Sequence, residues 1–307
     1  MNARLRALWD ELTPVDCATL LYVAVATGAL AQSFRDDDVP RWPWLVLAHV
    51  LMVGLVFLAP RARRRGGLGR FLGDWYPMLL LAGLYGEVGV LTVDAGFQND
   101  GLIQRMETFL FGSEVAYRWI REMPVVWFSW FVHACYLSYF AILYASPAGL
   151  WATGRRDAAR QTIFAVAVTF FICYVIFLFF PVAGPRYAFA AAHNAATDVG
   201  PARVARWLLD RGDSWGAAFP SSHVAASVVA TGMAWRHWRP LGWLLVPFTA
   251  GLVLAVVYGQ FHYAVDALSG LMLGAAMLGV MQLQRVPGEA GARMAARPDV
   301  VGALEAS

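Results

Sequence analysis

Long apolar runs recur along the chain, and short polar stretches separate them. Eight of these runs approach the length of about 20 residues that a helix needs to cross the hydrocarbon core of a bilayer. They cover residues 16–34, 43–60, 76–93, 125–148, 162–181, 218–235, 240–258 and 261–283. The pattern predicts an all-α fold, a polytopic membrane bundle of about eight transmembrane helices.

Residues 94–124 follow a different pattern, in which apolar and charged positions alternate with helical spacing. The apolar positions include Leu102, Ile103, Met106, Phe109 and Leu110. This spacing is typical of an amphipathic helix that lies along the membrane surface. We therefore expect one integral-membrane domain over residues 1–283, with its core at 70–283. The tail over 284–307 has no large apolar face and is expected to be disordered and cytoplasmic.

The composition narrows the class of protein. The chain is 59% hydrophobic and only 15% charged, whereas charged residues make up about 25% of an ordinary soluble domain. This excludes a soluble enzyme. The net charge of +3 is too balanced for a protein that binds nucleic acid. All 24 basic residues are arginines, which excludes every mechanism that depends on a lysine.

The distribution of arginine predicts how the helices are oriented, because cytoplasmic loops of membrane proteins carry an excess of basic residues. With a cytoplasmic N-terminus, fifteen arginines fall on the cytoplasmic side and nine on the other side. Five of the fifteen lie in the short segment 61–70. We expect an integral protein of a bacterial cytoplasmic membrane, with both termini in the cytoplasm.

The N-terminal residues 1–31 also allow a second interpretation, a secretory signal peptide that is removed. Ala29-Leu30-Ala31 resembles a cleavage site for such a peptide. The acidic residues Asp10, Glu11 and Asp16 instead favour a first span that is kept. The orientation of the remaining helices is the same in both cases.

Polar clusters stand at the ends of predicted spans, where ionisable groups are costly and are candidates for function. Pro220-Ser221-Ser222-His223 begins the sixth span, and the free backbone N–H groups of a helix N-terminus bind anions. Arg186, in Gly184-Pro185-Arg186-Tyr187 after the fifth span, is suited to hold a phosphate with two hydrogen bonds. The alternatives are an ordinary capped helix and a loop arginine that contacts lipid headgroups.

His262 and Asp266 begin the eighth span and, four residues apart, share one helix face. A carboxylate bonded to one imidazole nitrogen leaves the other nitrogen free to act as a nucleophile or base. The alternative is a local pair that stabilises a helix end. His223 and His262 are 39 residues apart, the length of one helical hairpin, so both return to the same side of the membrane as Arg186. We expect one site at the extracytoplasmic face.

Other polar residues are candidates for the lining of the same cavity: Tyr187, Tyr258, Gln260, Glu87 and His133. Structural hydrogen bonding between helices explains a histidine such as His133 at least as well. The loop 188–217 is long enough to cover the site. The sequence shows no spacing typical of a metal site, and we expect neither a metal nor another cofactor.

These motifs resemble those of a known family. Pro220-Ser221-Ser222-His223 resembles the P-S-G-H signature of the type-2 phosphatidic acid phosphatase superfamily, and the segment 262–266, H-Y-A-V-D, resembles its H-x-x-x-D signature. Gly184-Pro185-Arg186 stands in the place of its first motif. The resemblance covers residues 70–283 in order and spacing, and it implies an enzyme that acts on lipid phosphates.

The resemblance also implies a role for each residue. His262 would take the phosphoryl group as the nucleophile, with Asp266 orienting its ring. His223 would protonate the leaving alcohol and then accept a proton from the acceptor. The phosphate oxygens would be held by Arg186, Ser221 and Ser222.

Two cationic positions of the family pattern are missing. The first motif usually contains a lysine, and a proline follows its arginine, whereas Tyr187 follows Arg186 here. Val256 stands where the third motif usually has an arginine. A phosphodiester carries one negative charge less than a phosphate monoester dianion and needs less neutralisation. The departures resemble the inositol-phosphorylceramide synthase and sphingomyelin synthase branch, whose members move a phospho-headgroup to a lipid hydroxyl.

The resulting prediction is an integral-membrane lipid phosphotransferase, in which a phosphoryl group or phospho-headgroup passes through a phosphohistidine to a lipid alcohol. The donor would be a phospholipid or a lipid phosphate. With water as the acceptor, the same site would be a phosphatase of phosphatidate or of a polyprenyl (di)phosphate. A transporter whose polar groups line a pathway is a more remote alternative.

Overall fold

The computed structural model describes Arg6 and residues 9–33 and 42–283, and every regular element within them is a helix. The predicted disordered tail over 284–307 lies outside the described residues. Within these described residues, six helices are long and apolar enough to cross a membrane. They are α2 (Pro14–Ser33), α3 (Trp42–Arg65), α4 (Gly67–Thr92), α9 (Arg156–Phe179), α13 (Arg239–Tyr258) and α14 (Ala264–Leu283). The chain is therefore an integral membrane protein with the all-α fold that the apolar runs predict.

The predicted fourth and sixth spans differ from simple membrane helices. The fourth corresponds to α7 (Val126–Leu137) and α8 (Tyr139–Ala152), which meet at an angle of 41° and make a seventh span if they cross together. The sixth is α12 (Ser222–His237), which has 16 residues. It packs against α8, α9, α13 and α14 in the middle of the bundle, so protein surrounds it and lipid contact does not dictate its length. The count of eight spans stays a prediction.

The close packing of α12 against α14 depends on two glycines. A Cβ atom on Gly270 would lie 2.6 Å from the carbonyl oxygen of Ser221, and one on Gly274 would lie 2.9 Å from the Cβ atom of Val228. Small residues four positions apart commonly bring membrane helices together. The backbone N–H of Ser221 donates to the carbonyl of Asp266 at 3.0 Å. This packing places the starts of both helices, and the histidines near them, at one end of the bundle.

Short helices follow α4. They are η2 (Val93–Ala95), α5 (Asp100–Phe111) and α6 (Val115–Glu122). Four of the five apolar positions that suggested a surface helix are exposed on α5, namely Leu102, Met106, Phe109 and Leu110, and the fifth, Ile103, is buried. α5 is thus amphipathic, as its spacing predicts.

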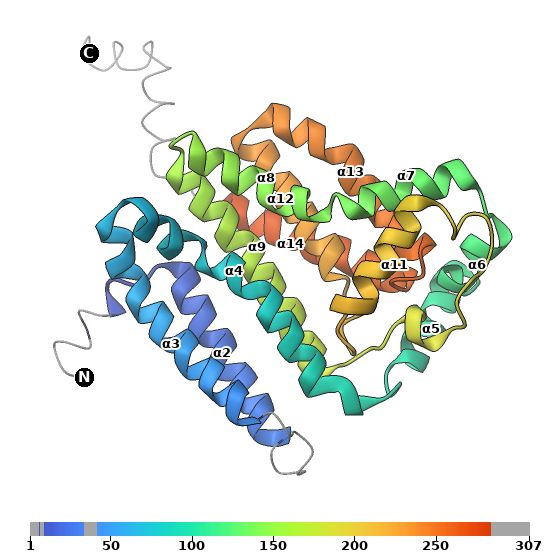
Figure 1. The fold of residues 1–307 in the computed structure, drawn as a ribbon, viewed down its shortest axis with the longest axis horizontal. Coiled ribbons are helices and arrows are strands. Elements are labelled where there is room, and N and C mark those ends of the chain that lie inside the picture. Colours follow the sequence, from blue (N-terminus) through green and yellow to red (C-terminus); the bar gives the residue numbers. More distant parts are fainter. Residues whose placement is uncertain (1–5, 7–8, 34–41, 284–307) are drawn as a thin grey trace, which may run out of the picture.

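The loop after α9 contains two more helices, α10 (Pro185–Ala188) and α11 (Gly200–Gly212). Figure 1 shows α5, α6 and α11 on one side of the bundle, opposite the hairpin of α2 and α3. The loop 188–217 therefore contains one helix, α11 with 13 residues, that packs on α7.

Buried polar contacts attach the hairpin of α2 and α3 to the rest of the bundle. The guanidinium of Arg63 on α3 donates two hydrogen bonds to the carboxylate of Asp16 on α2, at 2.7 and 2.8 Å, and its Nε atom donates to the carbonyl of Gly73 on α4 at 3.0 Å. The Nε2 atom of His49 on α3 lies 2.5 Å from Oε1 of Glu87 on α4. Glu87, which the sequence suggested as a cavity residue, is thus engaged with α3.

Candidate active site

A small pocket lies where the starts of α12 and α14 meet the loop after α9. Its lining comes from segments that are distant in the sequence, namely Tyr85, Tyr136, Ala183, Arg186, Leu209, Asp213, Ser214, Ala217, Ala218, His223, Phe261 and His262. The ring centroids of His223 and His262 are 5.7 Å apart. The length of one helical hairpin therefore brings the two histidines together, and Arg186 joins them as expected.

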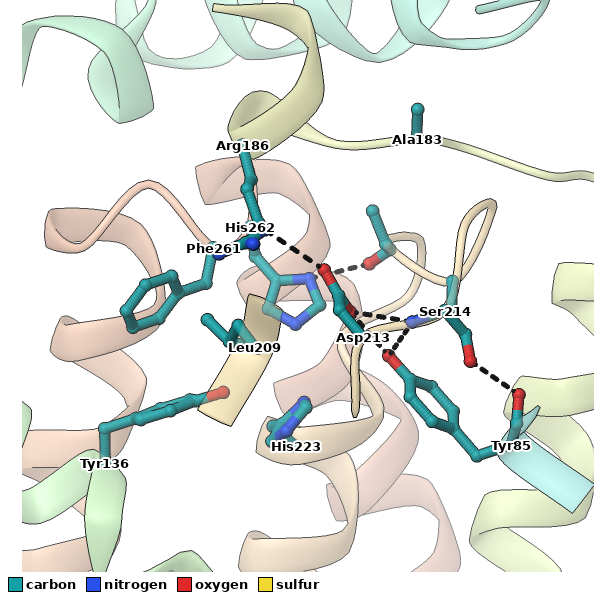
Figure 2. Close-up of a pocket in the computed structure, with 12 residues that line it drawn as sticks. Tyr85, Tyr136, Ala183, Arg186, Leu209, Asp213, Ser214, His223, Phe261 and His262 are labelled. Carbon is teal, nitrogen blue, oxygen red and sulfur yellow. Dashed lines mark hydrogen bonds and ion pairs between the residues drawn. The ribbon is translucent and has the colours of Figure 1, made fainter. Parts of the chain in front are cut away.

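The ring of His262 is held by a backbone carbonyl. Its Nδ1 atom lies 2.9 Å from the carbonyl oxygen of Ala218. Because a carbonyl only accepts hydrogen bonds, we assign the proton of the neutral ring to Nδ1, which leaves a lone pair on Nε2. Figure 2 shows this ring above that of His223.

Asp266 stands beside His262 without a direct hydrogen bond to its ring. The distance from its Oδ2 atom to Nδ1 of His262 is 3.6 Å, which is longer than a hydrogen bond. This oxygen instead accepts the backbone N–H of Tyr263 at 2.7 Å. The sequence predicted that Asp266 would orient the imidazole; the carbonyl of Ala218 makes that hydrogen bond. The fully buried carboxylate acts on the ring through its charge.

His223 is the second residue of α12 and is enclosed by aromatic side chains. Its ring centroid lies 5.6 Å from that of Tyr136 and 4.4 Å from that of Tyr139. Its Nδ1 atom is buried and makes no hydrogen bond in the structure. The aromatic rings fix the plane of the imidazole, and no protein group occupies this nitrogen.

Arg186 is paired with two acidic residues of the following loop. Its Nη2 atom donates to Oδ1 of Asp210 at 2.6 Å, and its Nε atom lies 3.5 Å from Oδ2 of Asp213. Burial lowers the pKa of Arg186, but the hydrogen bond to Asp210 and the charge of Asp213 outweigh it, and the pKa lies above its usual value. Arg186 therefore remains a cation that is already partly neutralised.

Asp213 connects several walls of the pocket. Its carboxylate accepts hydrogen bonds from the hydroxyls of Tyr85, at 2.9 Å, and Tyr187, at 3.1 Å, and from the backbone N–H of Ser214, at 3.0 Å. Burial, together with the charge of Asp213, raises the pKa of Tyr187 to about 12. Asp213 lies in the loop 188–217, and no local sequence motif indicates a partner as distant as Tyr85.

The two serines that were expected to bind phosphate occupy other positions. Ser221 is the N-cap of α12, and its hydroxyl accepts the backbone N–H of Val224 at 3.4 Å. Ser222 is buried and lines a neighbouring cavity. Neither side chain is part of the lining of the pocket that holds His262.

Two larger cavities adjoin the pocket. One has a volume of about 410 Å³ and is largely apolar; it is lined by α4, α7, α8, α9, α11 and α12 and includes Tyr136 and His223. The other has a volume of about 260 Å³ and includes Arg186 and Phe261, which also line the central pocket. Polar side chains in its wall are His133, Tyr187, Thr197, Arg206, Asp210 and Gln260. The small pocket therefore stands between an apolar cavity and a polar one.

The remaining site residues predicted from the sequence lie in the wall of the polar cavity or behind it. Tyr187, Gln260 and His133 line the polar cavity. The amide nitrogen of Gln260 is buried without a partner, and its backbone has a φ of 59°. Tyr258 is fully buried and donates to the carbonyl of Met123 at 2.8 Å, so it supports the wall from behind.

No cluster of three or more His, Cys, Asp or Glu side chains that could hold a metal ion occurs among the residues that the structure describes. The cationic side chain in the lining of the central pocket is Arg186. A phosphate bound in this pocket would meet that arginine and the two imidazoles.

Comparison with known families gives one match. Residues 102–280, more than half of the chain, match the model of a family described as the PAP2 superfamily. The matched stretch contains Arg186, His223, His262 and Asp266. Comparison with curated proteins and with solved structures gives no match.

Proposed function

The chain belongs to the PAP2 superfamily, and from that premise we propose that it transfers a phospho-headgroup from a phospholipid to a lipid alcohol through a phosphohistidine on His262. Membership in this superfamily supports chemistry on lipid phosphate esters in general. The observation that carries the more specific proposal is the position of the small pocket between one apolar and one polar cavity.

A phosphodiester with one lipid arm and one polar arm matches these two cavities. The lipid arm would lie in the apolar cavity, so that its ester oxygen is next to His223. The polar headgroup would lie in the second cavity, where Arg206, His133 and the free amide nitrogen of Gln260 supply hydrogen bonds. The phosphorus would then stand between His223 and His262, beside Arg186.

The first half of the reaction forms the covalent intermediate. The lone pair on Nε2 of His262 attacks phosphorus, and the bond from phosphorus to the lipid oxygen breaks. That oxygen takes a proton from the imidazolium of His223, and a free lipid alcohol results. The positive charge that develops on His262 is stabilised by the carboxylate of Asp266, 3.6 Å away.

The second half reverses these steps with another alcohol. A second lipid occupies the apolar cavity, and its hydroxyl gives a proton to His223 as its oxygen attacks phosphorus. The bond between phosphorus and Nε2 of His262 breaks, and a new phospholipid leaves. The apolar walls favour a lipid alcohol over water as the acceptor, which is the physical basis for transfer instead of hydrolysis.

The charge of the site supports a phosphodiester substrate. Arg186 is paired with Asp210 and Asp213, so little positive charge remains for a bound anion. A diester monoanion requires less compensation than a monoester dianion. The pairing of Arg186 with two carboxylates and the absence of two cationic residues of the family pattern therefore both favour a phosphodiester substrate, and with it transfer.

A product assay tests this proposal. The purified protein is supplied with a glycerophospholipid and with ceramide or diacylglycerol, in the presence and absence of EDTA. We expect a new phospholipid that carries the donor's headgroup, at a rate that EDTA does not change, because imidazoles move the protons and Arg186 stabilises the charge. Release of the free phospho-headgroup as the main product, or of free phosphate when phosphatidate is the donor, would indicate transfer to water and therefore a phosphatase. Loss of activity in EDTA, restored by a divalent cation, would contradict the metal-free mechanism.

We also propose that the site opens at the extracytoplasmic face of the membrane, because the arginine distribution predicts that orientation. His193, an exposed residue of the loop near the site, and Asp157, an exposed residue at the start of α9, mark the two faces. A membrane-impermeant thiol reagent added to intact cells is expected to label His193→Cys and to spare Asp157→Cys. The reverse labelling would overturn the orientation.

A further inference from the structure

The buried face of α5 carries three polar side chains that do not line the central pocket. Asp100, Gln104 and Glu107 are spaced four and three residues apart and therefore share one face of the helix. Asp100 is 2% exposed and Glu107 is fully buried, although both are carboxylic acids. Buried acids of this kind are retained only where they have partners, and the partners here belong to the two segments that carry Arg186 and His262.

Asp100 joins the arginine loop to the residue after His262. Its two carboxylate oxygens accept the backbone N–H groups of Ala183 and Gly184, each at 2.9 Å. One of the same oxygens accepts the hydroxyl of Tyr263 at 3.0 Å. Gly184 is the N-cap of α10, the short helix on which Arg186 lies. A single carboxylate thus holds the residue next to His262 and a residue two positions before Arg186.

Gln104 and Glu107 hold the start of α14. The amide nitrogen of Gln104 donates to the hydroxyl of Tyr263 at 3.0 Å. The Oε1 atom of Glu107 accepts the backbone N–H of Ala264, the first residue of α14, at 2.9 Å and that of Ala116 at 3.1 Å. Its Oε2 atom is buried without a partner. Both partners of Oε1 are backbone N–H donors, so a neutral side chain with an oxygen in the same place can replace the carboxylate.

We propose that Asp100, Gln104 and Glu107 are positioning residues, and that α5 sets the placement of Arg186 relative to His262. The inference rests on the proposed function, because this placement matters only if both groups act on the same phosphate. Both bonded segments are short turns between helices, and the backbone N–H groups of Ala183, Gly184 and Ala264 find their acceptors on α5. α5 supplies that constraint from outside the pocket.

The test compares Glu107→Ala with Glu107→Gln in the full-length protein. Alanine removes the acceptor for Ala264, and we expect kcat to fall by about 10²-fold, the cost of a misplacement of roughly 1 Å, with a smaller change in KM. Glutamine retains an oxygen in the place of Oε1 and is expected to restore most of kcat. Arg105→Ala, an exposed position on the same helix, is the matched control and should behave as the wild type.

A second measurement separates this inference from the proposed function. Inorganic vanadate mimics a phosphoryl group in transfer, and its affinity, measured by calorimetry, should fall in Glu107→Ala and recover in Glu107→Gln even if no turnover is found. Tyr263→Phe removes only the hydroxyl that is bonded to Asp100 and Gln104. It should also lower kcat and vanadate affinity, and it replaces Glu107→Ala in the test if that variant does not fold. Equal kcat and vanadate affinity in all variants, with only a lower thermal midpoint in Glu107→Ala, would overturn the inference. If the wild type is inactive but vanadate affinity still falls in Glu107→Ala and recovers in Glu107→Gln, the result would count against the proposed function and not against this inference.

Discussion

The His262→Ala variant is expected to lose turnover by at least about 10⁴-fold, because no other group can form the covalent intermediate. The Nδ1 atom of His262 lies 2.9 Å from the carbonyl oxygen of Ala218, and Nε2 is the nucleophile that we propose. The measurement is the rate of product formation by the purified variant, with phospholipid donor and lipid alcohol supplied together. His193→Ala, an exposed histidine of the loop near the site, is the matched control and should retain full activity.

A conservative variant separates chemistry from folding at this position. In His262→Ala the buried carbonyl of Ala218 loses its donor, which destabilises the protein by about 1–3 kcal/mol. His262→Asn retains an N–H donor for that carbonyl and has no nucleophilic nitrogen. It should unfold near the wild-type temperature and remain inactive. Activity near the wild-type level in His262→Asn would exclude a phosphohistidine on this residue.

The second large effect is expected for His223→Ala, which should lower turnover by about 10²- to 10⁴-fold, the usual contribution of a general acid. The reason is that the leaving lipid alkoxide then has no proton donor beside it. His223 lines both the central pocket and the apolar cavity, the position that a proton donor to the lipid oxygen requires.

The leaving group distinguishes this role from a structural one. A phosphodiester with a nitrophenolate leaving group needs little protonation, so His223→Ala should recover most of its activity toward that substrate, whereas His262→Ala should not. Tyr139, which packs on the ring of His223 at 4.4 Å between centroids, offers a control. Tyr139→Phe keeps the aromatic wall and should change neither rate strongly. An equal loss with both leaving groups in His223→Ala would rule out general-acid catalysis.

The sequence predicts those features that depend on local spacing. Apolar runs about 20 residues long indicate α2, α3, α9, α13 and α14 because a membrane helix must match the bilayer. The 39 residues between His223 and His262 predict their approach, because α12 and α13 form one hairpin. The resulting distance of 5.7 Å between the ring centroids confirms it.

The features that local spacing does not predict depend on contacts between distant segments. The carbonyl of Ala218 replaces the expected Asp266 as the partner of His262 because a backbone group leaves no mark in the sequence. Tyr263 and Asp100 are 163 positions apart, and only the path of α5 across the starts of α10 and α14 brings them together. An amphipathic pattern identifies the exposed face of α5 but does not reveal what its buried carboxylates hold.

The same limit applies to α12, which the sequence indicates as an ordinary membrane span. Its small residues Ala225, Ala226 and Ala230 are fully buried in the structure. In the sequence alone, these alanines do not reveal which helices pack against them. Gly270 and Gly274 of α14 supply the complementary surface. The approach of the starts of α12 and α14, where the site lies, follows from this packing and not from hydropathy.

The covalent state of His262 during turnover tests the central claim most directly. The protein is mixed with the phospholipid donor alone, quenched in alkali to preserve phosphoramidates, digested, and analysed by mass spectrometry. We predict that the peptide containing His262 gains the mass of a phosphoryl group together with the donor's headgroup, and that His262→Asn gains none. A gain of a phosphoryl group alone, with phosphatidate but not with the phosphodiester as donor, would indicate a phosphatase. A wild-type enzyme that turns over with His262 unmodified would contradict the account.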